Sequence, residues 1–136
     1  MYLIKVEVKG SPIHGKGVFA LENIPKGKIV WKFDPTHDLV LSLDDFNQLD
    51  ESAKVELKRV AYLSGSSGQY VYPPENDPAR FTNHDGERNN LSVKIDEEVS
   101  KEPYFIANRD IEAGEELTNN YSDFDESLKE SKSGWL

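Results

Sequence analysis

The sequence contains no cysteine among its 136 residues, so disulfides, cysteine nucleophiles and zinc sites built on thiolates are excluded. Any chemistry that the protein performs must come from oxygen and nitrogen atoms or from a bound cofactor. No stretch approaches the roughly 18 consecutive apolar residues that a membrane span needs. Residues 1–8 alternate like a strand and lack the apolar block of a signal peptide. We therefore expect an intracellular protein, cytoplasmic or, in a eukaryotic or host cell, nuclear, without membrane contact.

Basic residues are also scarce, because 16 Lys and Arg stand against 25 Asp and Glu, which gives a formal net charge of −9. This balance repels nucleic-acid phosphates, so we expect no direct binding to nucleic acid. It attracts cationic partners, although the same acidity also serves simply to keep a protein in solution. The composition, 37% hydrophobic and 30% charged, is typical of a globular protein, and 136 residues leave room for one domain with a modest core.

The periodicity predicts a mostly β protein with a helical insert. Short alternating or apolar runs bounded by turn residues predict strands at 2–8, 29–33, 39–41, 70–72, 91–95 and 104–107. Between the third and fourth of these, the spacing of Leu57, Val60 and Ala61 predicts one amphipathic helix from Ala53 to about Leu63. We expect this insert, about residues 43–63, to pack on the sheet and to have no catalytic role.

The most unusual segment is Arg80–Leu91, with the sequence RFTNHDGERNNL. It is polar and rich in amides, whereas a purely structural linker between two strands is normally built from Gly, Pro and Ser. The segment therefore indicates a functional site, although Asn, His and Asp together also make a turn. His84 taken alone could be a metal ligand or a general base. No metal site is predicted, because His14 and His37 lie in separate loops without metal-ligand spacing to it.

Near the N-terminus, Gly15 and Gly17 stand on either side of Lys16. Because neither glycine carries a Cβ atom, the backbone can turn tightly here and come close to another group. An ordinary hairpin turn has the same composition. A dinucleotide-binding loop is excluded, since the third glycine and the following helix are missing.

Three motifs in this order resemble those of the SET-domain protein methyltransferases. The motifs are HGKGVF at 14–19, RFTNH at 80–84 followed by Asn89, and GEELTNNY at 114–121. The first is weak alone, whereas the second and third together are specific. The resemblance covers residues 11–125, which we take as the core of a single SET domain over residues 1–136, with a C-terminal flank at 122–136. It implies small curved sheets of the β-clip kind and a C-terminal segment that threads under a loop as a pseudoknot.

The resemblance also implies the chemistry: S-adenosylmethionine as the methyl donor and a lysine of a protein or basic peptide as the acceptor. The two enter from opposite faces and meet through a narrow channel. Tyr121 stands at the position of the family's catalytic tyrosine, which contacts the methyl group and orients the amine. The expected donor-binding residues are Gly15, Lys16 and Gly17 through their main chain, Asn83 at the amino group, His84 at the adenine, and Tyr72, Arg80, Tyr121, Phe124 and Trp135 around the pocket.

The sequence departs from the family pattern at several of these positions. Asp85, Gly86 and Arg88 replace Ser, Cys and Pro, and Asn120 replaces an Asp. Asn119 stands where many relatives carry the Phe or Tyr that limits how many methyl groups fit, so the number of transferred methyl groups stays open. The competing hypothesis is therefore a catalytically weak module that keeps only a groove for basic peptides.

The flanks lack the cysteine-rich zinc clusters of many relatives, so the tail or a second subunit, as in a homodimer, would have to close the site. The resemblance also gives the acidic composition more weight, because a lysine-rich substrate such as a histone tail would be drawn to an acidic surface.

Overall fold

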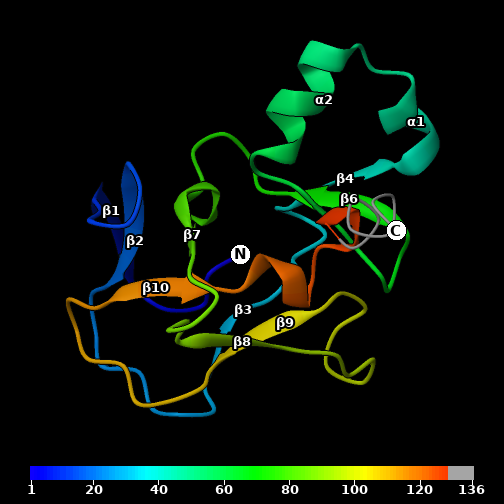
Figure 1. Cartoon of the computed structure of the whole chain (residues 1–136). Coiled ribbons are helices and arrows are strands. Elements are labelled where there is room, and N and C mark those ends of the chain that lie inside the picture. Colours follow the sequence, from blue (N-terminus) through cyan, green and yellow to red (C-terminus); the bar gives the residue numbers. More distant parts are fainter. Residues whose placement is uncertain (129–136) are drawn as a thin grey trace.

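The computed structural model describes residues 1–128, and its strands form three small sheets (Figure 1). The first has the order β1 (Val6–Gly10), β2 (Lys16–Ala20), β10 (Glu116–Asn119) and β7 (Asn83–His84). The second has the order β3 (Ile29–Trp31), β9 (Tyr104–Ala107) and β8 (Leu91–Lys94). The third has the order β4 (Leu39–Ser42), β6 (Gln69–Tyr72) and β5 (Tyr62–Leu63). This confirms the prediction of a mostly β protein built from small sheets.

The N-terminal hairpin pairs β1 with β2 from Val6↔Ala20 to Gly10↔Lys16. Gly15 lies in the connecting loop with φ +45°, a conformation that favours glycine. The predicted strand at residues 2–8 is wrong in its first half, because Tyr2 forms an isolated bridge with Trp31 and the Leu3 amide donates to the Val30 carbonyl at 2.8 Å. The chain moves from one sheet to another here, and an unbroken alternation of side chains does not reveal such a change.

Strand β10 lies between two strands that come from the other two sequence motifs. It pairs antiparallel with β2 through Leu117↔Val18 and parallel with β7 through Thr118↔Asn83 and Asn119↔His84. The insertion of a C-terminal strand between two earlier strands agrees with the threaded arrangement that the resemblance implies. It brings the three motifs together although about 100 residues separate the first from the third.

The helical insert lies over the edge of the sheet formed by β4 and β6 (Figure 1). It consists of α1 (Leu43–Asn47), capped by Ser42, and α2 (Glu51–Lys58), capped by Asp50. The predicted helix end near Leu63 is wrong. Helix α2 ends at Lys58, because Tyr62 and Leu63 form β5 and pair with Val71 and Tyr70 of β6. Both side chains are buried, so sheet pairing overrides the helical spacing.

Two hydrophobic clusters form the core. The larger contains Ile4, Val18, Ala20, Ile24, Val30, Trp31, Tyr62, Val71, Leu91, Phe105, Ala107, Ile111 and Leu117. The smaller contains Phe46, Ala61, Leu63 and Tyr70, and joins α1 to the third sheet. Within residues 1–128, no helix has the length and hydrophobicity that crossing a membrane requires.

Candidate active site

Tyr121 follows β10 directly and begins the short 3₁₀ helix η2 (Tyr121–Asp123). Its hydroxyl donates a hydrogen bond of 2.6 Å to the main-chain carbonyl of Thr82, the residue that ends the 3₁₀ helix η1 (Pro78–Phe81). Burial raises the pKa of Tyr121 above its ordinary value, so its phenol stays neutral and able to donate at physiological pH. A neutral hydroxyl and a main-chain oxygen therefore meet at one point.

His84 holds the backbone of Tyr121. The Tyr121 amide donates to His84 Nδ1 at 3.1 Å, and the two rings lie 5.0 Å apart between centroids. A nitrogen that accepts this bond carries no proton, which assigns the proton of the neutral ring to Nε2. His84 thus positions Tyr121, and it belongs to no group of three metal-ligating side chains among residues 1–128.

On one side of the Thr82–Tyr121 contact lies a cluster of polar groups that we call the Asn83 notch. It is made of Ser11, Lys16, Gly17, Asn83 and Glu116. The Asn83 side-chain amide lies 2.8 Å from Glu116 Oε2 and 3.1 Å from the Lys16 carbonyl oxygen. The Ser11 hydroxyl donates to the Glu116 carboxylate at 2.8 Å. A Cβ atom on Gly17 would lie 2.2 Å from Glu116 Oε2, so only glycine leaves room for the carboxylate.

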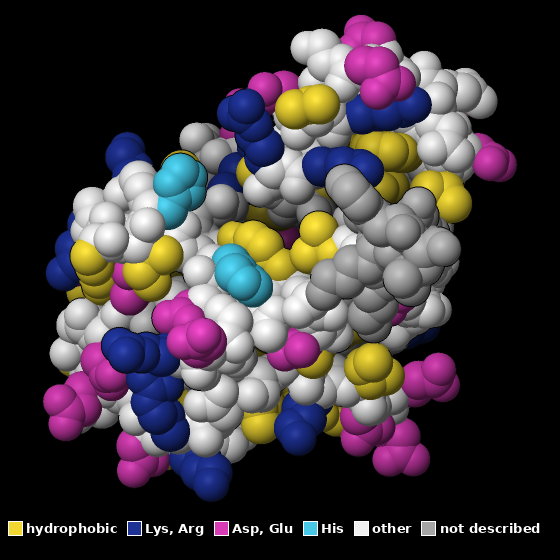
Figure 2. Space-filling model, viewed as in Figure 1, with side chains coloured by type: hydrophobic (Ala, Val, Ile, Leu, Met, Phe, Trp, Pro, Cys, Tyr) yellow, Lys and Arg dark blue, Asp and Glu magenta, His cyan; other side chains and the backbone are white. Residues whose placement is uncertain are grey.

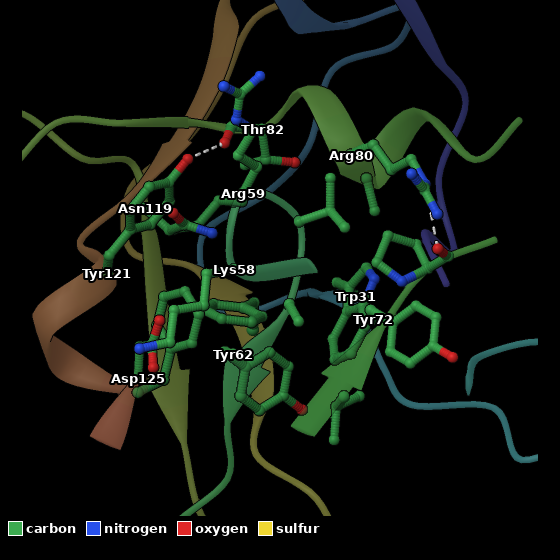
Figure 3. A pocket seen from close by; sticks show the side chains of 18 of the residues that line it. Trp31, Lys58, Arg59, Tyr62, Tyr72, Arg80, Thr82, Asn119, Tyr121 and Asp125 are labelled. Atoms are coloured by element: carbon green, nitrogen blue, oxygen red, sulfur yellow. Dashed lines mark hydrogen bonds between the residues drawn. The ribbon is translucent and has the colours of Figure 1, made fainter. Parts of the chain in front are cut away.

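On the side of Tyr121, side chains enclose a cavity of about 100 Å³, which we call the aromatic pocket (Figure 3). Its lining includes Tyr2, Trp31, Tyr62, Tyr72, Phe105, Tyr121 and Phe124, together with Lys58, Arg59, Arg80, Thr82, Asn119 and Asp125. Phe124 packs edge to face on Phe105 and Tyr62, at centroid distances of 4.9 and 5.4 Å. Such rings form a wall that excludes water and suits a long apolar or cationic side chain.

Asn119 gives this pocket an unpaired hydrogen-bond acceptor. The residue is only 7% exposed, and its Oδ1 has no hydrogen-bond partner among residues 1–128. Neighbouring Asn90 is 2% exposed and has both ends of its amide bonded, to the Glu116 carbonyl and the Thr118 amide. A buried acceptor without a partner is unfavourable, and such groups are rare in folded proteins.

The predicted site residues fall into two groups around the Thr82–Tyr121 contact. Tyr72, Arg80, Tyr121 and Phe124 line the aromatic pocket. Lys16, Gly17 and Asn83 belong to the notch, and Gly15 lies in the loop before it. His84 follows Asn83 and accepts a hydrogen bond from the Tyr121 amide. Arg80 donates from Nε to the carbonyls of Pro73 and Pro74, at 3.1 and 2.9 Å. Trp135 lies outside the described residues.

Several residues of the site were not predicted. Glu116 belongs to the third motif, so its place beside Gly17 could have been inferred from that motif. Trp31 and Phe105 come from segments that were predicted as strands, whereas Tyr62 was predicted to lie in the helix, and neither prediction places the three residues in a shared pocket. Lys58 and Arg59 end the helix to which no role in the site was assigned. No local signal marks these residues, because only the tertiary fold brings them to Tyr121.

A second polar cluster lies away from the aromatic pocket. His37, Asp38 and Asp77 bring possible metal-ligating atoms within 4.8 Å of one another. His37 Nε2 contacts Asp77 Oδ2, and the Met1 ammonium group contacts Asp38 Oδ2 at 3.0 Å, while Asp38 Oδ1 has no partner within residues 1–128. A cation would have to displace both of these contacts, so we interpret the cluster as an ion-pair network that ties the N-terminus to two loops.

Comparison with known proteins gives two findings. A family model described as the SET domain matches residues 15–122. Among solved structures, the chain is similar to a Plasmodium falciparum protein named as a putative histone methyltransferase. The two share 19% sequence identity with a TM-score of 0.57, and the match covers 87% of this chain and 93% of that chain. At this identity the similarity shows a shared fold.

Proposed function

Because the chain belongs to the SET-domain family, we propose that it is an S-adenosylmethionine-dependent protein lysine methyltransferase. One observation carries the proposal. The Tyr121 hydroxyl and the Thr82 carbonyl meet at 2.6 Å at the end of an aromatic pocket, and Asn83 and His84 follow Thr82 directly toward a separate polar notch. Methyl transfer requires a donor site and an acceptor site that meet at one point, and the notch and the pocket lie on either side of this contact.

The aromatic pocket is the proposed acceptor site. A lysine side chain has a long apolar stem, which the rings of Tyr62, Phe105 and Phe124 can enclose. Its amine ordinarily has a pKa of about 10.4 and must be neutral before its lone pair can attack. Partial desolvation favours the neutral form, and the free oxygen of Asn119 can accept one of its N–H groups. Under this assignment Tyr72 and Arg80 line the acceptor side rather than the donor side.

The Asn83 notch is the proposed site for the amino acid part of the donor. When bound, S-adenosylmethionine supplies a methyl carbon attached to a cationic sulfur atom. The chemistry of the residues fits such a ligand, because the Glu116 carboxylate and the Lys16 carbonyl, which both accept from the Asn83 amide, can also accept from an ammonium group. Asn83 holds both in place. His84 fixes the Tyr121 backbone, so that the hydroxyl lies beside the path between the two sites.

The chain's contribution to the reaction is alignment. The Asn83 notch would hold the donor, which would supply its methyl group to the acceptor nitrogen and keep the electron pair of the broken carbon–sulfur bond. Holding the reacting atoms in line lowers the activation free energy by several kcal/mol, about 7–11 in favourable cases. Tyr121 and Thr82 surround the point of transfer, and the aromatic walls keep water away from it.

The altered loop after His84 is ordered by its own residues. Asp85 Oδ1 accepts hydrogen bonds from the amides of Glu87 and Arg88, at 3.0 and 2.8 Å. These backbone hydrogen bonds, from Arg88 first and then Glu87, lower the pKa of Asp85. The carboxylate therefore shapes the loop at the positions that depart from the family pattern. This supports the enzyme over the binding module, because the departures leave the Tyr121 contact in place.

The experiment is a transfer assay with S-adenosylmethionine carrying a labelled methyl group, using a cell lysate and a set of peptides as acceptors. Mass spectrometry of the labelled products identifies the modified side chain. We expect label on lysine. Label on other residues would contradict the acceptor assignment, and absence of both transfer and donor binding would contradict the proposal as a whole.

A further inference from the structure

The edge of the aromatic pocket carries positive charge, in contrast to the protein as a whole. Lys58, Arg59 and Arg80 contribute to the lining, whereas Asp125 is the one acidic residue there among residues 1–128. The complete chain has a formal net charge of −9. In Figure 2, hydrophobic side chains lie at the bottom of a hollow below α2, and Lys and Arg side chains stand along its edge on the helix side. The entrance therefore differs in sign from most of the molecule.

These cations come from two separate parts of the chain. Lys58 ends α2 and Arg59 follows it, a place where basic residues commonly stabilise a helix dipole. Arg80 comes from η1, about 20 residues further on, and lies across the pocket from Tyr121 (Figure 3). Helix stabilisation accounts for the first two residues but not for the convergence of all three on one cavity.

The positive charges are only weakly compensated within residues 1–128. Arg59 pairs with Glu56 at 3.8 Å, between side chains that are 69% and 67% exposed, and such a pair contributes little. Lys58 lies 5.6 Å from the Phe46 ring, and no ion pair joins Lys58 or Arg80 to a described residue. Asp125 already accepts three hydrogen bonds at Oδ1, from the Leu63 and Ser127 amides and the Ser127 hydroxyl.

We propose that this basic edge selects lysines with acidic neighbours, so that the substrate is an acidic segment of a protein rather than a lysine-rich tail. The inference rests on the proposed function of the pocket and adds the substrate class to it. Carboxylates beside the target lysine would contact Lys58, Arg59 and Arg80. A peptide rich in Lys and Arg would meet like charges, which cost affinity and slow association.

The same charges suit the chemistry of the acceptor. A like charge nearby disfavours the protonated form of an amine, so a basic edge favours the neutral lysine that attacks. It would also repel the ammonium group of a lysine while that group is still charged. Acidic residues beside the target supply the compensating attraction. Selection by the flanks and activation of the amine then come from the same three side chains.

The test uses three peptides that each contain one lysine, flanked on both sides by two Glu, two Ser or two Arg residues. Binding is measured by fluorescence anisotropy and transfer by labelled methyl incorporation, at low and at high salt. We expect the Glu peptide to bind most tightly, the Ser peptide next and the Arg peptide least. The dissociation constants of the Glu and Arg peptides should differ about tenfold, since each exposed ion pair contributes a modest free energy. The difference should shrink in 1 M salt, where charges are screened beyond about 3 Å.

The matched variants are Lys58→Glu with Arg59→Glu, and as a control Lys54→Glu, on the same helix but outside the pocket lining. The double variant should reverse the order of the peptides, and the control should keep it. Equal or Arg-preferring binding, or no measurable binding of the Glu peptide, would overturn the inference. Binding in the expected order without transfer to any peptide would instead overturn the proposed function.

Discussion

The two sides of the Thr82–Tyr121 contact differ in how their polar groups are paired. In the Asn83 notch, the side chains of Ser11, Asn83 and Glu116 bond to one another and to main-chain carbonyls. In the aromatic pocket, the buried oxygen of Asn119 has no partner, and two of the three cations have no ion pair, within residues 1–128. The notch is therefore preorganised by its own hydrogen bonds, whereas the pocket holds polar groups that a bound ligand could pair with.

The largest expected effect comes from disrupting the notch alone, which tests whether the donor binds there. Gly17→Ala places a Cβ atom 2.2 Å from Glu116 Oε2, so the carboxylate must move and lose hydrogen bonds. Losing one charged hydrogen bond costs about 1.5–3 kcal/mol. We therefore expect the affinity for S-adenosylhomocysteine, measured by calorimetry, to fall about 10- to 100-fold. Gly10→Ala is the control, since a Cβ atom at Gly10 meets nothing within 4 Å. Equal affinities would contradict the placement of the donor.

Two buried asparagines, Asn90 and Asn119, test whether paired and unpaired polar groups contribute differently to stability. Asn90→Leu leaves the Thr118 amide and the Glu116 carbonyl without their partners and should lower the free energy of unfolding by about 2–4 kcal/mol. Asn119→Leu removes an oxygen that has no partner among the described residues and should cost less than about 1 kcal/mol. Urea denaturation of both variants measures this. A larger loss for Asn119→Leu would show that its oxygen is already paired in the free protein.

A separate effect, confined to high pH, is a loss of stability. Burial raises the pKa of Tyr2, Tyr62 and Tyr121 in the folded state. Each therefore stabilises the fold fully below the unfolded-state pKa of about 10, and loses that contribution as the pH rises toward the folded value. The free energy of unfolding should fall by up to about 1.4 kcal/mol per pH unit for each tyrosine above pH 10. Tyr2→Phe should reduce this slope, and an unchanged slope would exclude Tyr2 as a contributor.

The sequence predicted the parts of the site that lie within single motifs. Tyr121, Asn83 and Gly17 could be named because each stands in a short run whose residue types match a known family. The side of the contact on which Tyr72 and Arg80 lie depends on how strands pair, and no local pattern carries that information. The same limit explains the strand at residues 2–8, where the alternation continues through a change of sheet.

The charge count illustrates the same limit in another way. The family resemblance, combined with a net charge of −9, led to the expectation of lysine-rich substrates, and a net charge does not show how charges are distributed over the surface. The structure brings Lys58, Arg59 and Arg80 to the lining of one pocket, and this depends on tertiary packing, including that of Leu57 in α2 against the smaller hydrophobic cluster. The roles of Gly15, His84 and the other assigned residues stay predictions until ligands are bound to the protein.

The proposed function requires that Tyr121 acts between two separate binding sites. The most direct measurement compares wild type with Tyr121→Phe, both for binding of S-adenosylhomocysteine and for methyl transfer to the best peptide. We expect unchanged donor binding within about threefold and a loss of about 100-fold or more in kcat, the usual effect of removing one hydrogen-bond donor at a reacting centre. A variant that transfers methyl groups at the wild-type rate would contradict the assignment of Tyr121, whatever its affinity for the donor.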